Sequence, residues 1–433
     1  MRVLFATLGS LGDLHPCLAL AIELKAREHA VTIASTEAYR ERVVRLGLGF
    51  RALRPDWDPA DPALIRYCED LKSGPERLIR GLVLPHLEDT YRDLLAAAGD
   101  CDFMLAGEMV YAAPLVAEKL RLPWGSIILS PCSFLSAHDP SLLVTVPHLI
   151  RLRRAGWRIN RAFLDLGMWL TRHWWEPVRH LRVREGLNPE CAPLTRDKFS
   201  PHLVLALFPS VLGVPQPDWP ASTVQTGFAF YNGDAEPGMA EELAQFLAAG
   251  EPPIVFTLGS TAVAHPGRFY EVSQDAALRL ERRAVLIGAR DLKVKSDRVL
   301  AVPYADYAKV FPRASIVVHQ GGSGTTGQAL RAGRPMLFVP FGWDQPDNAL
   351  RVERLGAGLS VARKEYSVET ATVALARLLR DSAFSGQAGD VARVIDAQDG
   401  MKQGCDAIES AVRLGNQAAS LGIGATLPIS SLR

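Results

Sequence analysis

Residues 3–35, VLFATLGSLGDLHPCLALAIELKAREHAVTIAS, contain the repeating unit from which the fold follows. The apolar run at 3–7 is typical of a buried strand, and a turn at Gly9 ends it. Apolar residues at helical spacing over 18–25 predict a helix, and a second apolar run at 31–35 predicts the next strand. A strand–helix–strand unit of this kind indicates a parallel sheet.

The same alternation continues along the chain. In the first half it predicts further strands at 103–106, 125–129 and 203–207, and in the second half at 254–257, 284–287, 299–302, 316–318 and 336–339. Strands that are almost continuously apolar are covered by helices on both faces. The sequence therefore predicts the α/β class, with two Rossmann-like, doubly wound domains that face each other across a cleft.

A proline-rich segment separates the two arrays. Residues 209–233 mix prolines and glycines without a sustained period, so we predict a linker there. The first domain then covers residues 1–208 and the second residues 234–415, and weak periodicity predicts a flexible tail over 416–433. Ligands of this fold class bind beyond the carboxyl ends of the strands, which places the site between the domains.

The composition excludes several classes of protein. The 433 residues carry 48 Lys and Arg against 47 Asp and Glu, and a net charge of +1 argues against a dedicated nucleic-acid binder. The six cysteines show no C-x-x-C spacing, so neither a disulfide framework nor a thiolate zinc site is expected. No export signal and no apolar run of about 18 residues is found, so we expect a soluble, cytoplasmic protein.

One segment departs from this charge balance. Residues 149–184 hold nine arginines against two acids, Asp165 and Glu176, and aromatic residues are interleaved with them. We interpret the segment as one or two basic amphipathic helices inserted in the first domain. Two roles for its aromatic side remain open: it packs on the domain, or it forms an apolar acceptor pocket or a face that rests on anionic lipid.

The turn after the first strand carries the first candidate site residues. Residues 8–16, LGSLGDLHP, lead from a strand into a helix, where glycines let backbone amides come close to a ligand. Asp13 and His15 are candidates for proton transfer in this turn. Asp13 also stands just before a helical run, so a purely structural role as a helix cap remains open.

A second glycine-rich turn lies in the second half. Residues 317–327, VVHQGGSGTTG, formally contain G-x-G-x-x-G, and Asp344 follows about 20 residues later. A dinucleotide fingerprint normally follows the first strand of its domain, whereas this turn follows roughly the fourth. We therefore favour a nucleoside diphosphate, held by backbone amides, by hydroxyls from Ser323 to Thr325 and by His319 as a neutralising contact.

Two more loops at strand ends carry polar groups. Residues 340–348, PFGWDQPDN, place the carboxylate of Asp344 beside the amide of Gln345, a combination that suits sugar hydroxyls. The turn FTLGST at 256–261 includes Ser260 and adds backbone amides near the predicted phosphates.

These motifs together resemble the family 1 glycosyltransferases, which use nucleotide sugars. Residues 302–358 resemble their donor-binding signature, and the pattern G-x-x-G-D-x-x-P at 9–16 resembles the acceptor-side loop of the bacterial and sterol-modifying members. The donor signature comprises His319, the turn Gly321–Thr325, A-G-x-P at 332–335, and Asp344-Gln345 with Asn348. The segments at 130–138, 216–220, 226–228 and 256–261 are similar to those of rhamnosyltransferases in rhamnolipid synthesis.

The resemblance implies a role for each matching residue. Asp13 would be the catalytic base and His15 secondary, with Glu108 as a speculative helper, while Tyr304 would stack on the nucleobase. Ribose recognition is unassigned, because Gly327 stands where plant members have a glutamate. The implied donor-site residues are Ser260, His319, Gly321, Gly322, Ser323, Gly324 and Thr325 near the diphosphate, and Asp344 and Gln345 on the sugar.

The resemblance also implies an activity: inverting, metal-independent glycosyl transfer, with the nucleotide sugar as a co-substrate and no cofactor. The donor would be UDP-glucose or dTDP-rhamnose, and the acceptor an apolar hydroxylated molecule of phenolic, sterol-like or hydroxy-lipid type. No nucleic-acid partner is expected, and peripheral contact with the inner face of the membrane remains open. The alternatives are an NAD(P)-dependent oxidoreductase and a non-catalytic nucleotide-sugar or lipid-binding protein.

Overall fold

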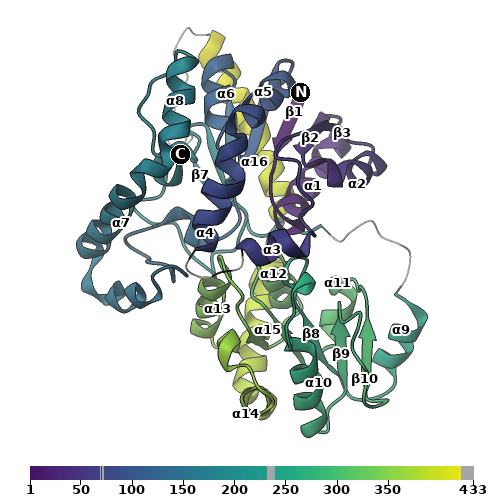
Figure 1. The fold of residues 1–433 in the computed structure, drawn as a ribbon. Helices are drawn as coiled ribbons and strands as arrows, with labels where there is room; N and C mark the ends of the chain where they lie inside the picture. The colour runs from purple at the N-terminus through teal and green to yellow at the C-terminus, as the bar shows by residue number, and fades with distance from the viewer. Residues whose placement is uncertain (69, 71–72, 232–238, 421–433) are drawn as a thin grey trace.

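The computed structural model describes residues 1–68, 70, 73–231 and 239–420. These residues form two α/β domains, one above the other in Figure 1, each built on its own sheet. Every strand pair in both sheets is parallel. The predicted fold class is confirmed.

The described part of the first sheet has seven strands in the order β3-β2-β1-β4-β5-β6-β7. The chain starts in the centre, runs to one edge, returns to β4 and continues to the other edge. The reversal between β1 and β4 brings their following loops together at the carboxyl edge, where ligands of this fold bind. The strands are β1 (Arg2–Ala6), β2 (Ala30–Ser35), β3 (Gly49–Ala52), β4 (Phe103–Gly107), β5 (Trp124–Ile128), β6 (Leu203–Ala206) and β7 (Thr223–Gln225).

The second sheet repeats this plan with six described strands in the order β10-β9-β8-β11-β12-β13. Here the reversal falls between β8 and β11, so the turns at 258–262 and 320–323 lie next to each other. The strands are β8 (Ile254–Thr257), β9 (Ala284–Ile287), β10 (Val299–Val302), β11 (Ile316–His319), β12 (Met336–Phe338) and β13 (Gly358–Ser360).

Helices cover both faces of each sheet (Figure 1). In β1, for example, Phe5 belongs to the buried cluster on one face and Leu4 to the cluster on the other. The first domain contains α1 (Leu11–Ala26), α2 (Arg40–Arg45), α3 (Pro62–Cys68), α4 (Gly74–Glu76), α5 (Leu87–Ala98), α6 (Ala113–Leu120), α7 (Trp157–Thr171) and α8 (Glu176–Arg184). The helices that follow are α9 (Glu241–Ala248), α10 (Phe269–Arg279), α11 (Tyr307–Val310), α12 (Ser323–Arg331), α13 (Gln345–Arg354), α14 (Val368–Arg380), α15 (Ser382–Asp396) and α16 (Gly400–Ser420).

The linker predicted at 209–233 is too long at its start. Residues 223–225 form β7, which pairs with β6 as the last strand of the first sheet. The first domain therefore continues past residue 208. Edge strands of this kind are short and half-buried, so they lack the apolar run that marks the central strands. Residues 232–233 lie outside the described residues.

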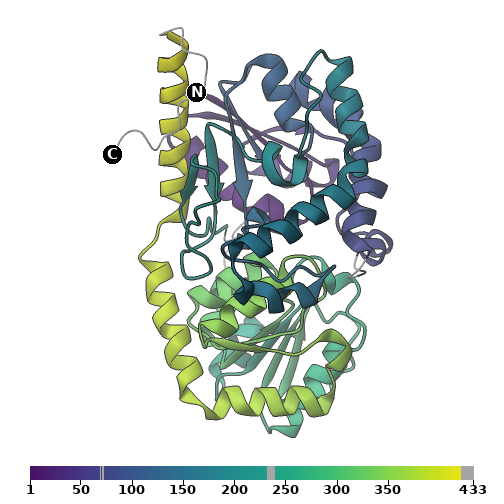
Figure 2. The same ribbon diagram turned by 90° about the vertical axis from the view of Figure 1, so that its left-hand side faces the viewer.

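The chain returns to the first domain at its C-terminal end. Helix α15 packs on the second domain, and Figure 2 shows the yellow helix α16, which follows it, running up along the first domain. Cys405, Ile408 and Val412 of α16 belong to the same buried cluster as Leu20 of α1. The sequence placed residues 400–415 with the second domain and began the tail at 416, whereas the helix packs on the first domain and runs to Ser420. Residues 421–433 of the predicted tail lie outside the described residues.

The arginine-rich segment forms helices, as its pattern predicts. Turns of 3-10 helix at Pro147–Ala155 and Arg172–Trp175 flank α7, and α8 follows. The two α-helices pack differently: α8 buries Val178 and Leu181 in the core of the first domain, but α7 buries only Asn160. None of the helices among the described residues combines the length and the apolar character needed to cross a bilayer.

Candidate active site at the domain interface

Direct hydrogen bonds join the loops at the carboxyl ends of the two sheets. The Ser130 hydroxyl, two residues after β5, donates to Oδ1 of Asn348 on α13 at 3.1 Å. The backbone N–H of Leu142 donates to Oδ1 of Asp347 at 2.7 Å. Segments at the carboxyl ends of the two sheets therefore meet at one interface.

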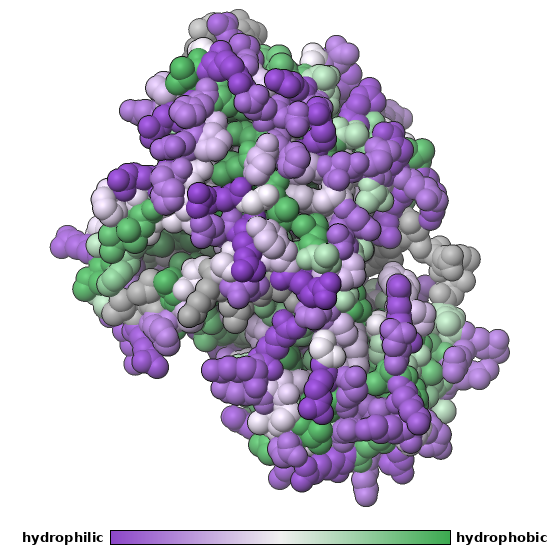
Figure 3. All heavy atoms as spheres, viewed as in Figure 1, coloured by the Kyte–Doolittle hydropathy of each residue, from purple (hydrophilic) through white to green (hydrophobic). Residues whose placement is uncertain are grey.

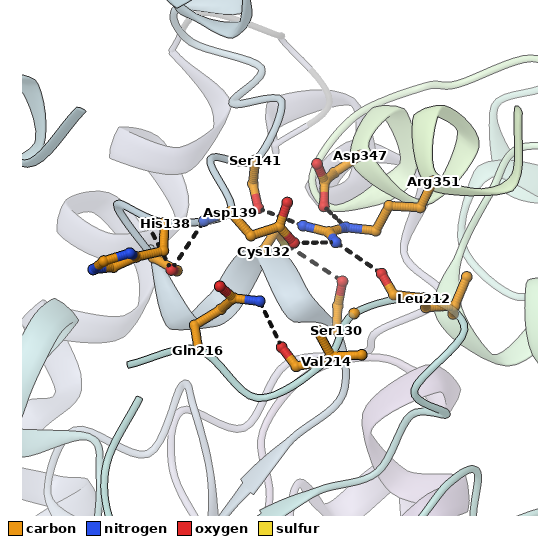
Figure 4. Close-up of polar contacts among 12 residues, drawn as sticks. Ser130, Cys132, His138, Asp139, Ser141, Leu212, Val214, Gln216, Asp347 and Arg351 are labelled. Atoms are coloured by element: carbon orange, nitrogen blue, oxygen red, sulfur yellow. Dashed lines mark hydrogen bonds and ion pairs between the residues drawn. The ribbon is translucent and has the colours of Figure 1, made fainter. Parts of the chain in front are cut away.

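A buried arginine is the centre of this interface. Figure 4 shows Arg351 reaching from α13 toward Asp139, Ser141 and the Leu212 carbonyl of the first domain. Its guanidinium contacts Asp347 at 2.6 Å and Asp139 at 2.6 Å, and donates to the Leu212 carbonyl at 2.7 Å. Because only 4 % of its side chain is exposed, the charge depends on these partners. Arg351 thus holds α13, which begins at Gln345 directly after Asp344, against the first domain.

Asp13 takes part in the start of α1. Its Oδ2 accepts hydrogen bonds from the Ser10 backbone N–H at 2.8 Å and from the Ser10 hydroxyl at 3.3 Å, while Ser10 is the N-cap residue. The structural role that the sequence left open is therefore real, but it belongs to a capping box in which Asp13 is the third helical residue. The other oxygen, Oδ1, has no hydrogen bond among the described residues, so one carboxylate oxygen can face a ligand.

The surroundings of Asp13 shift its ionisation. Loss of contact with bulk water raises the pKa of its carboxyl from 3.8 to about 6, the hydrogen bonds from Ser10 oppose this, and the negative charges of Asp344 and Glu108 raise it further. Asp344 belongs to the second domain, so its negative charge raises the pKa of Asp13 from across the interface. A carboxylate with this pKa is a base at neutral pH.

His15 is held on the outer side of the same turn. Arg42 donates to His15 Nε2 at 3.1 Å, and the imidazole lies 4.9 Å from the Tyr231 ring. An arginine has no acceptor, so Nε2 must carry a lone pair directed at Arg42 rather than at a substrate. This arrangement supports the secondary role predicted for His15.

His319 at the end of β11 presents an unused donor. Its ring is fully buried, and its Nδ1 accepts the Gly321 backbone N–H at 3.0 Å, which leaves the proton on Nε2. Nε2 has no hydrogen-bond partner among the described residues. Burial lowers the pKa of His319 to about 3, so the ring is neutral. The neutralising charge predicted for His319 is therefore replaced by a neutral N–H donor.

The N-terminus of α12 lies next to this donor. Gly322 occupies the N-cap position and supplies no capping side chain, and no side chain of the described residues satisfies the amides of Ser323, Gly324 and Thr325. These amides and the helix dipole favour an anion. The Ser323 hydroxyl is engaged, because it donates to Asp344 Oδ2 at 2.6 Å. Ser323 therefore offers its backbone, and not its hydroxyl, to a phosphate.

Asp344 and Gln345 keep part of their polar atoms for a ligand. Asp344 accepts from Ser323 and from Asn348 through Oδ2, which leaves Oδ1 without a partner among the described residues. Gln345 Oε1 accepts the backbone N–H groups of Phe341 and Gly342 at 2.8 and 3.1 Å, so only its amide N–H groups remain. A carboxylate acceptor next to amide donors fits the hydroxyls of a sugar.

The two remaining predicted donor residues, Ser260 and Tyr304, follow strands β8 and β10 of the second sheet. Ser260 is exposed in the turn after β8, beside the reversal point of the second sheet. Tyr304, two residues after β10, is 74 % exposed, so its ring is accessible for stacking. Arg351 and Asp139 were not predicted from the sequence. Positions 347 and 351 have the spacing of an ion pair on a helix, but nothing in the sequence pattern links Arg351 to Asp139, 212 positions away.

A groove lies in the first domain beneath α7. Its volume is about 610 Å³. Phe134 and Phe199 are part of its lining. Lys198, which precedes Phe199, lies with its Nζ 3.0 Å from Glu108 Oε2. The same Nζ donates to the carbonyl of Ser133, which precedes Phe134. Further apolar lining includes Leu135, Leu164, Met168 and Trp219.

The glycine at position 321 can be tested directly. Its φ is +99°, and a Cβ there would lie 2.9 Å from the Gln345 carbonyl oxygen. We expect Gly321→Ala to destabilise the protein by about 1–3 kcal/mol and to weaken binding of nucleoside diphosphates, measured by thermal unfolding and calorimetry. Gly386→Ala on α15 is the control, because a Cβ there meets nothing within 4 Å and is expected to stabilise slightly. Equal behaviour of the two variants would contradict the role of the turn.

Comparison with known proteins gives matches over both domains. The glycosyltransferase family 28 N-terminal domain matches residues 3–124, and the C-terminal domain of erythromycin biosynthesis protein CIII-like proteins matches residues 288–400. The O-mycaminosyltylonolide 6-deoxyallosyltransferase of Streptomyces fradiae is 32% identical over 94% of this chain and 97% of its own length. A sterol 3-beta-glucosyltransferase of Arabidopsis thaliana is 27% identical over 93% of this chain and 64% of its own length.

Solved structures show the same fold. The spinosyn forosaminyltransferase SpnP has a TM-score of 0.70 and 21% identity, and covers 95% of this chain and 99% of its own. The glycosyltransferase VinC in complex with dTDP has a TM-score of 0.68 and 21% identity, with 95% and 100% coverage. Both similarities extend over the two domains together.

Proposed function

This chain belongs to the GT-B glycosyltransferases, and from that membership we propose that it transfers a hexose or deoxyhexose from a UDP- or dTDP-sugar to a hydroxyl of an apolar acceptor. The observation that carries the donor side is the buried, unpaired Nε2–H of His319 beside the uncapped N-terminus of α12. A diphosphate would satisfy both features, since each presents N–H groups without an acceptor.

The proposed reaction is a single displacement with inversion. Asp13 takes the proton of the acceptor hydroxyl as that oxygen attacks the anomeric carbon, and the bond from this carbon to the diphosphate oxygen breaks. The free Oδ1 and the raised pKa of Asp13 support this assignment. The charge that develops on the leaving diphosphate would be met by the α12 amides and by His319, so the proposed mechanism is metal-independent.

Relatives support both donor classes and an apolar acceptor. One relative is named for a 6-deoxy sugar on O-mycaminosyltylonolide and another for glucose on a sterol. We therefore keep dTDP-rhamnose and UDP-glucose as donors, and sterol-like, phenolic and hydroxy-lipid molecules as acceptors. The apolar groove beneath α7 is the proposed acceptor region, because Phe134 and Phe199 connect it through Lys198 to Glu108 near Asp13.

A product screen tests the proposal. UDP-glucose and dTDP-rhamnose are each incubated with sterol-like, phenolic and hydroxy-lipid acceptors, and mass spectrometry detects the glycosylated product together with released nucleoside diphosphate. Product with the native protein, and product formation at least about 100-fold slower with Asp13→Asn, supports the proposal. Consumption of reduced nicotinamide, or nucleotide-sugar binding with no product from any pair, would overturn it.

The donor role of His319 gives a separate prediction. His319→Phe keeps a flat apolar ring beside Phe338 but removes the Nε2–H donor and the acceptor for Gly321. A hydrogen bond to a charged group contributes about 1.5–3 kcal/mol, so we expect UDP or dTDP to bind about 10- to 100-fold more weakly in calorimetry. His202→Phe is the control, a histidine of the first domain whose pKa is also lowered by burial. Unchanged affinity in His319→Phe would remove His319 from the donor site.

A further inference from the structure

Helix α7 carries an apolar face that no part of the described chain covers. Five large apolar side chains of its outward face are 39–57 % exposed, and of its fifteen residues only Asn160 is buried. Asn160 donates to the Ala137 carbonyl at 3.0 Å and so attaches the helix to the domain. Figure 3 shows green, hydrophobic spheres gathered along α7 at the left edge of the molecule. The five side chains are Ile159, Phe163, Leu166, Trp169 and Leu170.

The spacing of these residues separates two sides of the helix. Positions 159, 163, 166 and 170 follow the i, i+4, i+7, i+11 pattern of one helical face. Leu164 and Met168 lie on the opposite side and line the groove beneath α7. The outward apolar face is therefore not an extension of the side that lines the groove. It is a second, independent apolar face, which is unusual for a helix whose outer side meets only water.

Positive charge surrounds this face. Exposed arginines precede it at Arg151, Arg154 and Arg158, and Arg172 follows it. The Arg158 and Arg172 guanidinium groups lie over the rings of Trp157 and Trp169, at 5.5 and 4.3 Å from the ring centres. Asp165 is the one acid from 149 to 172, and it pairs with Arg161. An apolar face that includes Trp169 and is bordered by arginines matches the boundary between acyl chains and anionic headgroups.

We propose that α7 is a docking helix for an anionic lipid surface, with its outward apolar face at the acyl boundary and its arginines on the lipid phosphates. Charge complementarity selects this occupant: a neutral apolar partner would leave the arginines without counter-charges, while each arginine near an anionic bilayer adds to binding. The protein as a whole has a charge of +1, so the attraction is local to this segment. The proposal does not depend on the acceptor or on the transfer reaction, since docking is measured without substrate.

Vesicle binding of the full chain tests the proposal. Vesicles of phosphatidylglycerol and phosphatidylcholine in equal parts are compared with pure phosphatidylcholine vesicles by co-sedimentation, at low and high salt. We expect the native protein to bind the anionic vesicles at least about tenfold more strongly, and high salt to weaken this binding. Absence of binding to anionic vesicles would overturn the proposal.

Two variants, one on α7 and one at the arginines that precede its apolar face, and one matched control locate the surface. The triple variant Leu166→Ser, Trp169→Ser, Leu170→Ser removes apolar side chains that are already exposed, so the core is not changed. The second variant, Arg151→Gln, Arg154→Gln, Arg158→Gln, removes charge alone. We expect each to reduce binding to anionic vesicles about tenfold. The control Val44→Ser, Val373→Ser, Val394→Ser changes three exposed valines elsewhere and should bind as the native protein does.

The other candidate occupant is a second copy of this chain. Sedimentation of the native protein and of the serine variant decides this point. If the native protein self-associates and the serine variant does not, the face is an interface between copies and the lipid proposal is wrong. A monomeric native protein whose vesicle binding is reduced about tenfold in both the serine and the glutamine variant supports it.

Discussion

Asp13→Asn is expected to reduce kcat by about 10²- to 10⁴-fold while the affinity for UDP or dTDP stays within twofold of native. The reason is that the amide cannot take up the acceptor proton, but its carbonyl oxygen can still accept the Ser10 backbone N–H and so preserve the start of α1. Product formation by mass spectrometry and diphosphate binding by calorimetry measure the two effects separately.

The pH dependence gives a second readout of the same residue. A base works only when it is ionised, and the pKa of Asp13 is raised to about 6. The rate should therefore fall about tenfold for each pH unit below 6 and level off above it. Residual activity of Asp13→Asn should lack this limb. Asp381→Asn is the control, since Asp381 caps α15 through the Ala383 N–H far from the interface and should leave both readouts unchanged. Native turnover in Asp13→Asn would assign the base elsewhere.

Arg351→Met is expected to have the largest effect on stability. The substitution leaves Asp347, whose side chain is 1 % exposed, without its partner at 2.6 Å, and it also removes the contacts to Asp139 and Leu212. Breaking a buried ion pair from one side typically costs about 3–5 kcal/mol, because the remaining charge stays buried. Urea and thermal unfolding measure the loss, and kcat should fall as well because the donor loops are no longer fixed against the first domain.

Two further variants make this test specific. Arg393→Met removes an arginine paired with Asp390 on α15, where the side chains are 78 % and 57 % exposed, so a change below about 1 kcal/mol is expected. The double variant Arg351→Met, Asp347→Asn neutralises the acid that Arg351→Met strands, and should recover part of the lost stability. If Arg351→Met shifts the transitions no more than Arg393→Met, the buried network does not hold the domains together.

The central strands could be predicted from sequence because they are buried on both faces. Residues 254–257 and 284–287, for instance, are apolar except for Thr257, and the strands have the predicted bounds. Three strands at sheet edges, β3, β7 and β13, were not predicted. One residue is buried in β3 and one in β13, and none is buried in β7. An edge strand needs no continuous apolar run, and its pairing partner is remote in sequence.

For the site, too, features with a local sequence signal could be predicted and features that depend on the folded structure could not. Turns at strand ends carry a local signal, so Asp13 and His319 could be identified as candidates from glycine spacing alone. Their ionisation could not, because burial shifts the pKa of both residues, and the pKa of Asp13 is raised further by the carboxylate of Asp344 from the other domain. The interface around Arg351 was likewise hidden, since Asp139 and Ser141 belong to a stretch without periodicity.

Helix α16 makes the first domain discontinuous in the chain. The buried cluster around Leu20 is completed by Cys405 and Ile408, and Cys405 lies 385 positions further along the chain. The first domain therefore cannot close its core during synthesis until α16 has been made. The same fact sets the rule for building chimeras with relatives. A transplanted first domain must include α16 (Gly400–Ser420), and the exchanged block is the internal stretch between the end of β7 and the start of α16.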